Sequence, residues 1–133
     1  NQAAQPKRVR ISAAGWSVNA CPMTYYTITP TATGYVAAWP TKGQIYFARL
    51  DKDGAVLPPG EIKTPGKNGM RTGLIGLSAS DGVTVIAWKN KDILEWQLYD
   101  TQGQPIGKPG SPASPGNGAA GAVLRNGHYV VLP

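Results

Sequence analysis

Carboxylates are the side chains of this sequence that could carry out hydrolysis. Glycoside hydrolysis needs two of them a short distance apart, with pKa values that differ. The acidic residues are Asp51, Asp53, Glu61, Asp81, Asp92, Glu95 and Asp100. Four of the seven stand in turn-like sequences, where Asp is common because its side chain accepts backbone N–H bonds. Glu95 lies inside a strand-like run, and we interpret it as a polar residue that points outward. The acids therefore predict turns and no catalytic pair.

The single histidine and the single cysteine predict no metal or nucleophilic site. A zinc site built from protein ligands uses several Cys and His side chains, whereas this chain has only Cys21 and His128. We interpret Cys21 as a small buried hydrophobe, with a reactive or intermolecular thiol as the alternative. We interpret His128 as a surface or partner-contacting residue. Glycines occur singly at turns, so no phosphate-binding loop and no cofactor is predicted.

Aromatic and basic side chains are the candidate contacts for a partner or ligand. Amphipathic rings concentrate binding energy at interfaces and stack on sugars. The candidates are Trp16, Tyr25, Tyr26, Tyr46, Trp96, His128, Lys7, Arg8 and Arg10. The formal net charge is +6, but nucleic-acid binding would need basic residues interleaved with stacking rings on one face. Most rings here fall within strand patterns, so a nucleic-acid partner is not predicted.

An internal repeat must position these residues. Residues 34–54 return without a gap at 83–103, with Trp88 at the place of Trp39, and a shorter copy occupies 127–133. A repeat of 40 to 50 residues, each unit a few short strands, is typical of propellers and related arrays. Gly and Pro contribute 17 and 12 of the 133 residues, which excludes a helical bundle. We expect the two tryptophans to pack between neighbouring sheets.

The strand patterns predict a single all-β domain of antiparallel four-stranded, blade-like repeats, about two and a half propeller blades. Residues 1–6 form a tail, 7–60 the first blade with a flanking basic strand, 61–107 the second blade, and 108–133 a linker and a partial third blade. The expected strands are 7–12, 23–29, 35–39, 44–50 and 55–57, then 74–78, 83–88, 93–99 and 104–106, and finally 119–124 and 128–132. The sequences at 51–54 and 100–103 predict hairpin turns.

The third unit lacks its two outer strands, so its edge is predicted to be unpaired. The basic strand at 7–12, in which Val9 and Ile11 alternate with polar residues, is the spare element that we expect to fill this edge. Known propellers have about four or more blades, so this chain cannot close a ring alone. It either dimerises into a six-bladed ring, is a fragment or subunit that depends on other chains, or curls into an open sandwich of sheets.

Short motifs give the chain a family resemblance. Residues 12–22 read S-x-x-G-W-x-x-N-A-C-P, and an A-W strand end at 38–39, I-Y-x-A-R at 45–49 and D-x-x-G at 51–54 follow. With these motifs the chain resembles the carboxy-terminal half of bacterial exported sialidase-like propeller proteins of unassigned function. The resemblance implies the propeller fold. True sialidases use an arginine triad, a Tyr nucleophile and Asp-box turns that end in Trp, and the turn at 51–54 lacks that Trp.

The sequence favours a non-catalytic exported module that docks on a partner protein or a larger complex. The alternative is a carbohydrate-binding, lectin-like propeller formed by oligomerisation, and a sialidase-type glycoside hydrolase comes third. No apolar run approaches the ~18 residues of a membrane span. Because the chain begins at Asn1, we expect an export signal to have been removed, with the protein in the periplasm or outside the cell.

Overall fold

The computed structural model of the protein describes residues 7–13, 15, 26–67, 75–115 and 120–132. All regular elements in these ranges are β-strands, which confirms the predicted all-β class. The strands are β1 (Thr27–Pro30), β2 (Gly34–Thr41), β3 (Gln44–Asp51), β4 (Ile62–Lys67), β5 (Gly76–Ser80), β6 (Val83–Asn90), β7 (Ile93–Tyr99), β8 (Pro105–Gly110), β9 (Gly121–Arg125) and β10 (His128–Leu132). No helix that is long and apolar enough to cross a membrane occurs in the described ranges.

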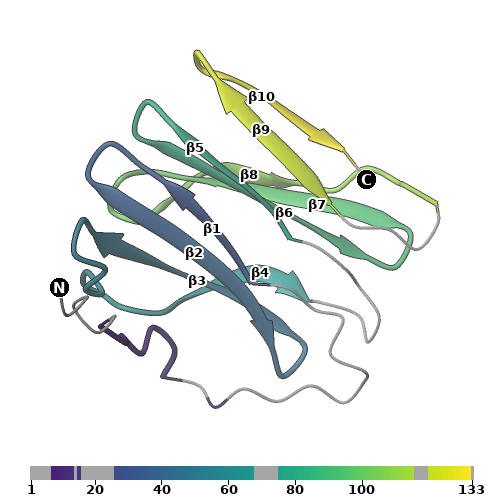
Figure 1. Cartoon of the computed structure of the whole chain (residues 1–133). Helices are drawn as coiled ribbons and strands as arrows, with labels where there is room; N and C mark the ends of the chain where they lie inside the picture. Colours follow the sequence, from purple (N-terminus) through teal and green to yellow (C-terminus); the bar gives the residue numbers. More distant parts are fainter. Residues whose placement is uncertain (1–6, 14, 16–25, 68–74, 116–119, 133) are drawn as a thin grey trace, which may run out of the picture.

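The strands form three antiparallel sheets stacked on one another (Figure 1). The first sheet has the order β1-β2-β3-β4, the second β5-β6-β7-β8, and the third contains only β10-β9. The two complete sheets have the same order because they are built from the two full copies of the repeat. The blade-like arrangement and the two-stranded third unit are therefore as predicted.

The fourth strand of each complete sheet lies later in the chain than predicted. Residues 55–57 form no strand, and Val56 makes only an isolated bridge to Leu50. After residues 58–60, Pro-Pro-Gly, the chain pairs again with β3 through β4, beginning with Ile62 opposite Phe47. In the second sheet β8 extends to Gly110, into the segment predicted as a linker. A proline-rich sequence is still compatible with an outermost strand, which pairs along one edge only.

A glutamine anchors β4 where its register with β3 shifts. The register changes between Gln44 and Tyr46, and the Gln44 amide donates to the carbonyl of Thr64 at 2.8 Å and also to that of Gly66. The Thr64 hydroxyl in turn donates to the carbonyl of Ile45 at 3.0 Å. Side chains therefore satisfy backbone carbonyls that the irregular ladder leaves unpaired.

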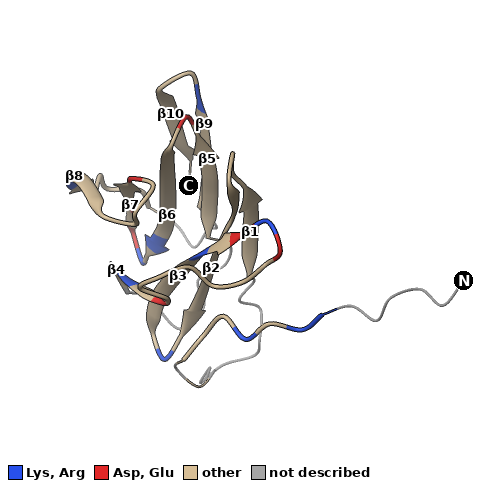
Figure 2. Ribbon diagram, turned by 90° about the vertical axis from the view of Figure 1, so that its left-hand side faces the viewer, with Lys and Arg blue, Asp and Glu red and all other residues tan. Residues whose placement is uncertain are grey.

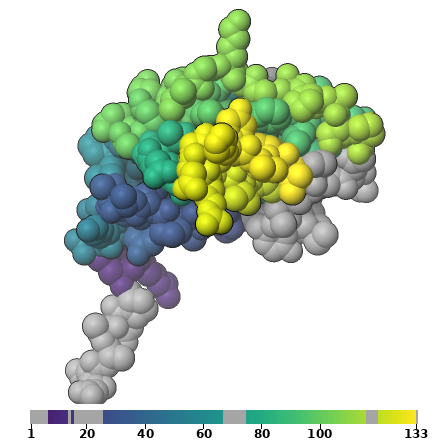
Figure 3. Space-filling view, turned by 90° about the horizontal axis from the view of Figure 1, so that it is seen from above, coloured from purple at the N-terminus to yellow at the C-terminus, as the bar shows by residue number. Residues whose placement is uncertain are grey.

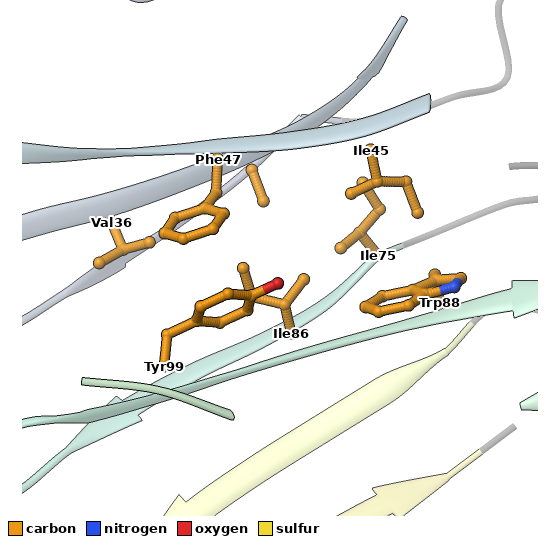
Figure 4. Close-up of a cluster of buried hydrophobic side chains, with 8 residues drawn as sticks. Val36, Ile45, Phe47, Ile75, Ile86, Trp88 and Tyr99 are labelled. Atoms are coloured by element: carbon orange, nitrogen blue, oxygen red, sulfur yellow. The ribbon is translucent and has the colours of Figure 1, made fainter. Parts of the chain in front are cut away.

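The main core lies between the first and second sheets (Figure 4). Phe47 of β3 packs on Tyr99 of β7 with ring centroids 4.5 Å apart, and Ile86 and Trp88 of β6 join them. Trp88 is 2 % exposed, and its indole N–H donates to the Glu95 carboxylate at 2.7 Å. Glu95 is therefore half-buried and bound to Trp88, whereas we expected it to point freely outward.

The other repeated tryptophan is buried on the opposite face of the first sheet. Trp39 is 2 % exposed but belongs to a separate cluster with Ala37, Ala48 and Leu50, and it stacks on Tyr46 with centroids 6.5 Å apart. The prediction that both tryptophans are core residues is correct. The prediction that both lie between sheets holds for Trp88 alone, because no sheet of the described structure covers Trp39.

The amino-terminal segment covers this face of the first sheet. Residues 7–12 form no strand, and Ile11 packs against the cluster around Trp39. The Ser12 hydroxyl donates to the Glu61 carboxylate at 2.7 Å, and Thr41 donates to the carbonyl of Gly15 at 3.1 Å. The prediction that 7–12 fills the third sheet is therefore wrong. The apolar cluster around Trp39 is where Ile11 packs instead.

Candidate functional site

The third sheet buries one face and exposes the other. Ala122 and Val131 pack against Ala87 and Leu94 of the second sheet. On the opposite side, the three aliphatic residues Val123, Val130 and Leu132 are 60 %, 57 % and 60 % exposed. We call these three side chains the third-sheet face. Figure 3 shows the third sheet in yellow at the surface of the molecule.

The repeat shows that this face corresponds to a buried one. Val130 and Leu132 align with Val85 and Ala87 of the second unit, and both of those residues are 0 % exposed. They are covered because the third sheet packs on the second. The third-sheet face therefore has the residue types of an interface between sheets but no sheet over it in the described structure.

A second apolar area lies beside β10, on the outer strands of the second sheet. Trp96 and Leu98 of β7 are half-buried, and Ile106, paired with Leu98, is 40 % exposed. We call these three residues the open strip. Trp96 aligns with Phe47, which is only 1 % exposed. The difference arises because β7 covers Phe47, whereas the described part of the third sheet has no strand that corresponds to β7. Trp96 is covered in part, by Gly110 of β8 and by the Tyr129 ring, with ring centroids 6.3 Å apart.

The edge of the third sheet adjoins the open strip. Among the described residues, β10 pairs with β9 alone, whereas the corresponding strands β2 and β6 each pair on both sides. The predicted unpaired edge is thus present. Arg125 is the only Lys, Arg, Asp or Glu residue in β9 and β10, and Figure 2 shows both strands largely in tan. A sheet edge without charged residues is well suited to pairing with another strand.

A cleft of about 370 Å³ lies between the first and second sheets at the end that carries the β1–β2 and β5–β6 turns. Tyr35, Asp81 and Arg49 are among its lining residues. The Arg49 guanidinium donates to the carbonyls of Thr101 and Pro58, so it joins the turns that border the cleft. The Asp81 carboxylate accepts a bond from the neighbouring Ser80 hydroxyl at 2.9 Å.

The acidic residues act mainly in turns. The Asp51 carboxylate accepts the N–H groups of Asp53 and Ala55 at 2.9 and 2.8 Å. The Asp100 carboxylate accepts those of Gln102 and Gln104 at 2.8 and 2.9 Å. Both hairpin turns are therefore confirmed. No three His, Cys, Asp or Glu side chains in the described part of the chain are grouped to hold a metal ion.

The predicted contact residues are scattered over the described structure. Tyr26 is 65 % exposed on the first sheet, Tyr46 is half-buried against Trp39, and the exposed basic residues are Lys7, Arg8 and Arg10. Trp16, Tyr25 and Cys21 lie outside the described residues. Of the candidates that the structure describes, only His128, exposed at the start of β10, belongs to the third sheet, and only Trp96 contacts it.

Sequence reasoning did not select the residues of the third-sheet face. It selected candidates by aromatic and basic side chains, and Val123, Val130 and Leu132 are neither. The signal was nevertheless available, because alignment of the third copy with the second places Val130 and Leu132 at buried interface positions.

Comparison of the chain with protein-family models, with curated proteins and with solved structures finds no match. The resemblance to sialidase-like propellers therefore stays a prediction from the sequence motifs. The predictions of carbohydrate binding and of export likewise rest on the sequence alone.

Proposed function

We propose that this protein is a non-catalytic binding module that docks a partner protein on the third-sheet face. The observation that carries the proposal is the contrast between Val130 and Leu132, 57 % and 60 % exposed, and their repeat equivalents Val85 and Ala87, both fully buried. Contiguous exposed apolar residues of this kind mark interaction sites. Covering them would contribute roughly 1 to 2 kcal/mol per side chain.

The structure of the repeat indicates the chemistry of the partner. Where the first two sheets meet, Val36 and Ala38 of β2 are covered by Ile86 and Trp88 of β6. Val130 and Leu132 occupy the places of Val36 and Ala38 in the third unit, so their complement is a sheet with similarly bulky apolar side chains. We therefore propose a β-sheet protein as the partner.

A second copy of this chain is a poor occupant of the third-sheet face. Its matching surface would be the outer face of its first sheet, where Trp39 and Leu50 lie. Those residues are 2 % and 6 % exposed, and the amino-terminal segment packs on their cluster through Ile11. Stacking of copies end to end would require this segment to leave, whereas a different protein requires no such rearrangement.

The test compares two sets of surface substitutions that remove equally exposed apolar side chains. One variant carries Val123→Lys, Val130→Lys and Leu132→Lys on the third sheet. The control carries Tyr26→Lys and Ile28→Lys on the first sheet, where the side chains are 65 % and 61 % exposed. We expect both variants to unfold within about 0.5 kcal/mol of the wild type per substitution, because the sites are on the surface.

Proteins retained from an extract of the source organism are quantified by mass spectrometry for the wild type, the third-sheet variant and the control. A retained protein is then purified, and its affinity is measured by calorimetry with all three. We expect wild type and control to bind equally and the third-sheet variant to bind at least about tenfold more weakly. Equal binding by the third-sheet variant would refute the proposal.

A further inference from the structure

The free edge of β10 presents two outward-facing pairs of backbone groups. β9 and β10 are joined by a two-residue turn, Asn126 and Gly127, with φ angles of 50° and 73°, so Arg125 and His128 flank it as a hydrogen-bonded pair. Antiparallel ladders alternate, and Val130 therefore bonds toward β9. The N–H and C=O groups of Tyr129 and Val131 point to the opposite side.

The second sheet shows what occupies this edge in a complete unit. Tyr129 and Val131 align with Thr84 and Ile86 of β6, which face Tyr99 and Gln97 of β7. In that sheet β7 therefore supplies the third strand. β7 also covers part of the first sheet, because its Tyr99 packs on Phe47 with ring centroids 4.5 Å apart.

The open strip lies where the missing strand would pack. Trp96, Leu98 and Ile106 share one face of the second sheet, and Trp96 lies at the border of the area that β9 and β10 cover. Trp96 already contacts Tyr129 of β10, so a strand added beside β10 would extend over the strip. An extended strand has every second side chain on one face, which fits alternate apolar residues directed at the strip.

From these two features together we propose that β10 binds an extended strand of the partner, which adds to the third sheet in antiparallel orientation. The strand bonds to the backbone of Tyr129 and Val131. Its residue opposite Tyr129 is a bulky apolar one that packs on Trp96, as Tyr99 packs on Phe47. This inference rests on the proposed docking function and specifies how the partner binds.

A second copy of this chain does not fit as the source of the added strand. Antiparallel pairing of β10 with β10 of a second copy uses a twofold axis perpendicular to the sheet. Both copies would then place their second sheets on the same side of the joined sheet. Each second sheet extends past β10 through β7 and β8, as the contact of Trp96 with Tyr129 shows, so the two would overlap.

The experiment uses a synthetic peptide with the sequence of residues 91–101, KDILEWQLYDT, as the model strand. A fluorescent label reports its binding to the full chain by anisotropy. In the second sheet, Gln97 and Tyr99 occupy hydrogen-bonded positions opposite Ile86 and Thr84, so their N–H groups point to β6. Those of Trp96 and Leu98 point to the other side.

Two doubly N-methylated peptides provide a matched comparison. We expect methylation at Gln97 and Tyr99 to weaken binding by about tenfold or more, because the two backbone bonds to Val131 and Tyr129 are lost. Methylation at Trp96 and Leu98 should change it by less than about threefold. Equal loss for both peptides would overturn the proposed pairing, since it would show that binding does not depend on the edge of β10.

Two variants of the protein complete the test. Val131→Pro removes an outward N–H without removing a bond to β9, and Val131→Thr keeps that N–H. We expect the proline variant to bind the peptide about tenfold more weakly and the threonine variant within about threefold of the wild type. In hydrogen exchange, the amides of Tyr129 and Val131 should become protected when the peptide is bound. Unchanged exchange at both amides would refute strand addition.

The two proposals can fail separately. If the third-sheet variant no longer binds the partner protein and the peptide does not pair with β10, the docking proposal is supported and strand addition is refuted. If the peptide does not pair and the third-sheet variant binds the partner normally, both proposals are refuted.

Discussion

Tyr99 combines a central position in the core with an unsatisfied polar group. It is 3 % exposed, and its hydroxyl is buried without a hydrogen-bond partner among the described residues. A buried, unpaired hydroxyl costs about 1 to 3 kcal/mol. We therefore expect Tyr99→Phe, which keeps the ring on Phe47, to raise the free energy of unfolding by about 1 kcal/mol in urea denaturation. A loss of similar size would show that the hydroxyl has a partner.

Burial of Tyr99 also predicts that the free energy of unfolding depends on pH, and this dependence is a control for the Tyr99→Phe experiment. Burial raises the pKa of the Tyr99 hydroxyl well above its ordinary value of 10.0. Above about pH 10 the Tyr99 hydroxyl ionises in the unfolded chain but keeps its proton in the folded chain. The free energy of unfolding therefore falls as pH rises, by up to about 1.4 kcal/mol per pH unit. Below about pH 10, both states are neutral and this effect is absent. The Phe variant should lose less stability than the wild type between about pH 9 and 11.

At the scale of the elements, β4 depends on a glycine. A Cβ added at Gly66 would lie 2.3 Å from Cε2 of Trp88, whereas one added at Gly121 of β9 would meet nothing within 4 Å. Trp88 is closely packed in the core, so it has little room to move. β4 can therefore lie this close to Trp88 only because residue 66 has no side chain.

We expect Gly66→Ala to lower the free energy of unfolding by about 1 to 3 kcal/mol, because it overpacks the contact with Trp88. Gly121→Ala, the matched control in an open position, should stay within about 0.5 kcal/mol of the wild type. Thermal unfolding followed by circular dichroism and by tryptophan fluorescence measures both. Equal stability of the two variants would mean that β4 does not pack on Trp88.

The hairpins show how local chemistry determines an element. Asp51 and Asp100 each accept two backbone N–H groups within their own turn, and Gly54 and Gly103 have φ angles of 80° and 79°. All of these contacts lie within four residues of the Asp. The turns were therefore predictable from short stretches of sequence.

The whole molecule depends on contacts that are far apart in the sequence. The amino-terminal segment covers the outer face of the first sheet, with Ile11 against the cluster around Trp39. Without that cover the first sheet would expose an apolar face at one end of the stack, as the third sheet does at the other.

We expect Ile11→Ala to lower the free energy of unfolding by about 1 kcal/mol and to increase quenching of tryptophan fluorescence by acrylamide, as Trp39 becomes accessible. Val9→Ala, at a side chain that is 37 % exposed, should change stability by less than about 0.5 kcal/mol. If the two substitutions had equal effects, Ile11 would not be the residue that anchors the segment.

Repeats, alternation and turn chemistry are properties of short windows, and the sequence by itself therefore determined the all-β class, the two matching sheets and the shortened third unit. Tertiary structure decided which surfaces meet. It placed β4 rather than residues 55–57 at the edge of the first sheet and put Ile11 over Trp39 instead of against the third sheet. It also left Val130 and Leu132 exposed where Val85 and Ala87 are buried. Burial depends on the whole set of available apolar faces, and no local pattern contains that information.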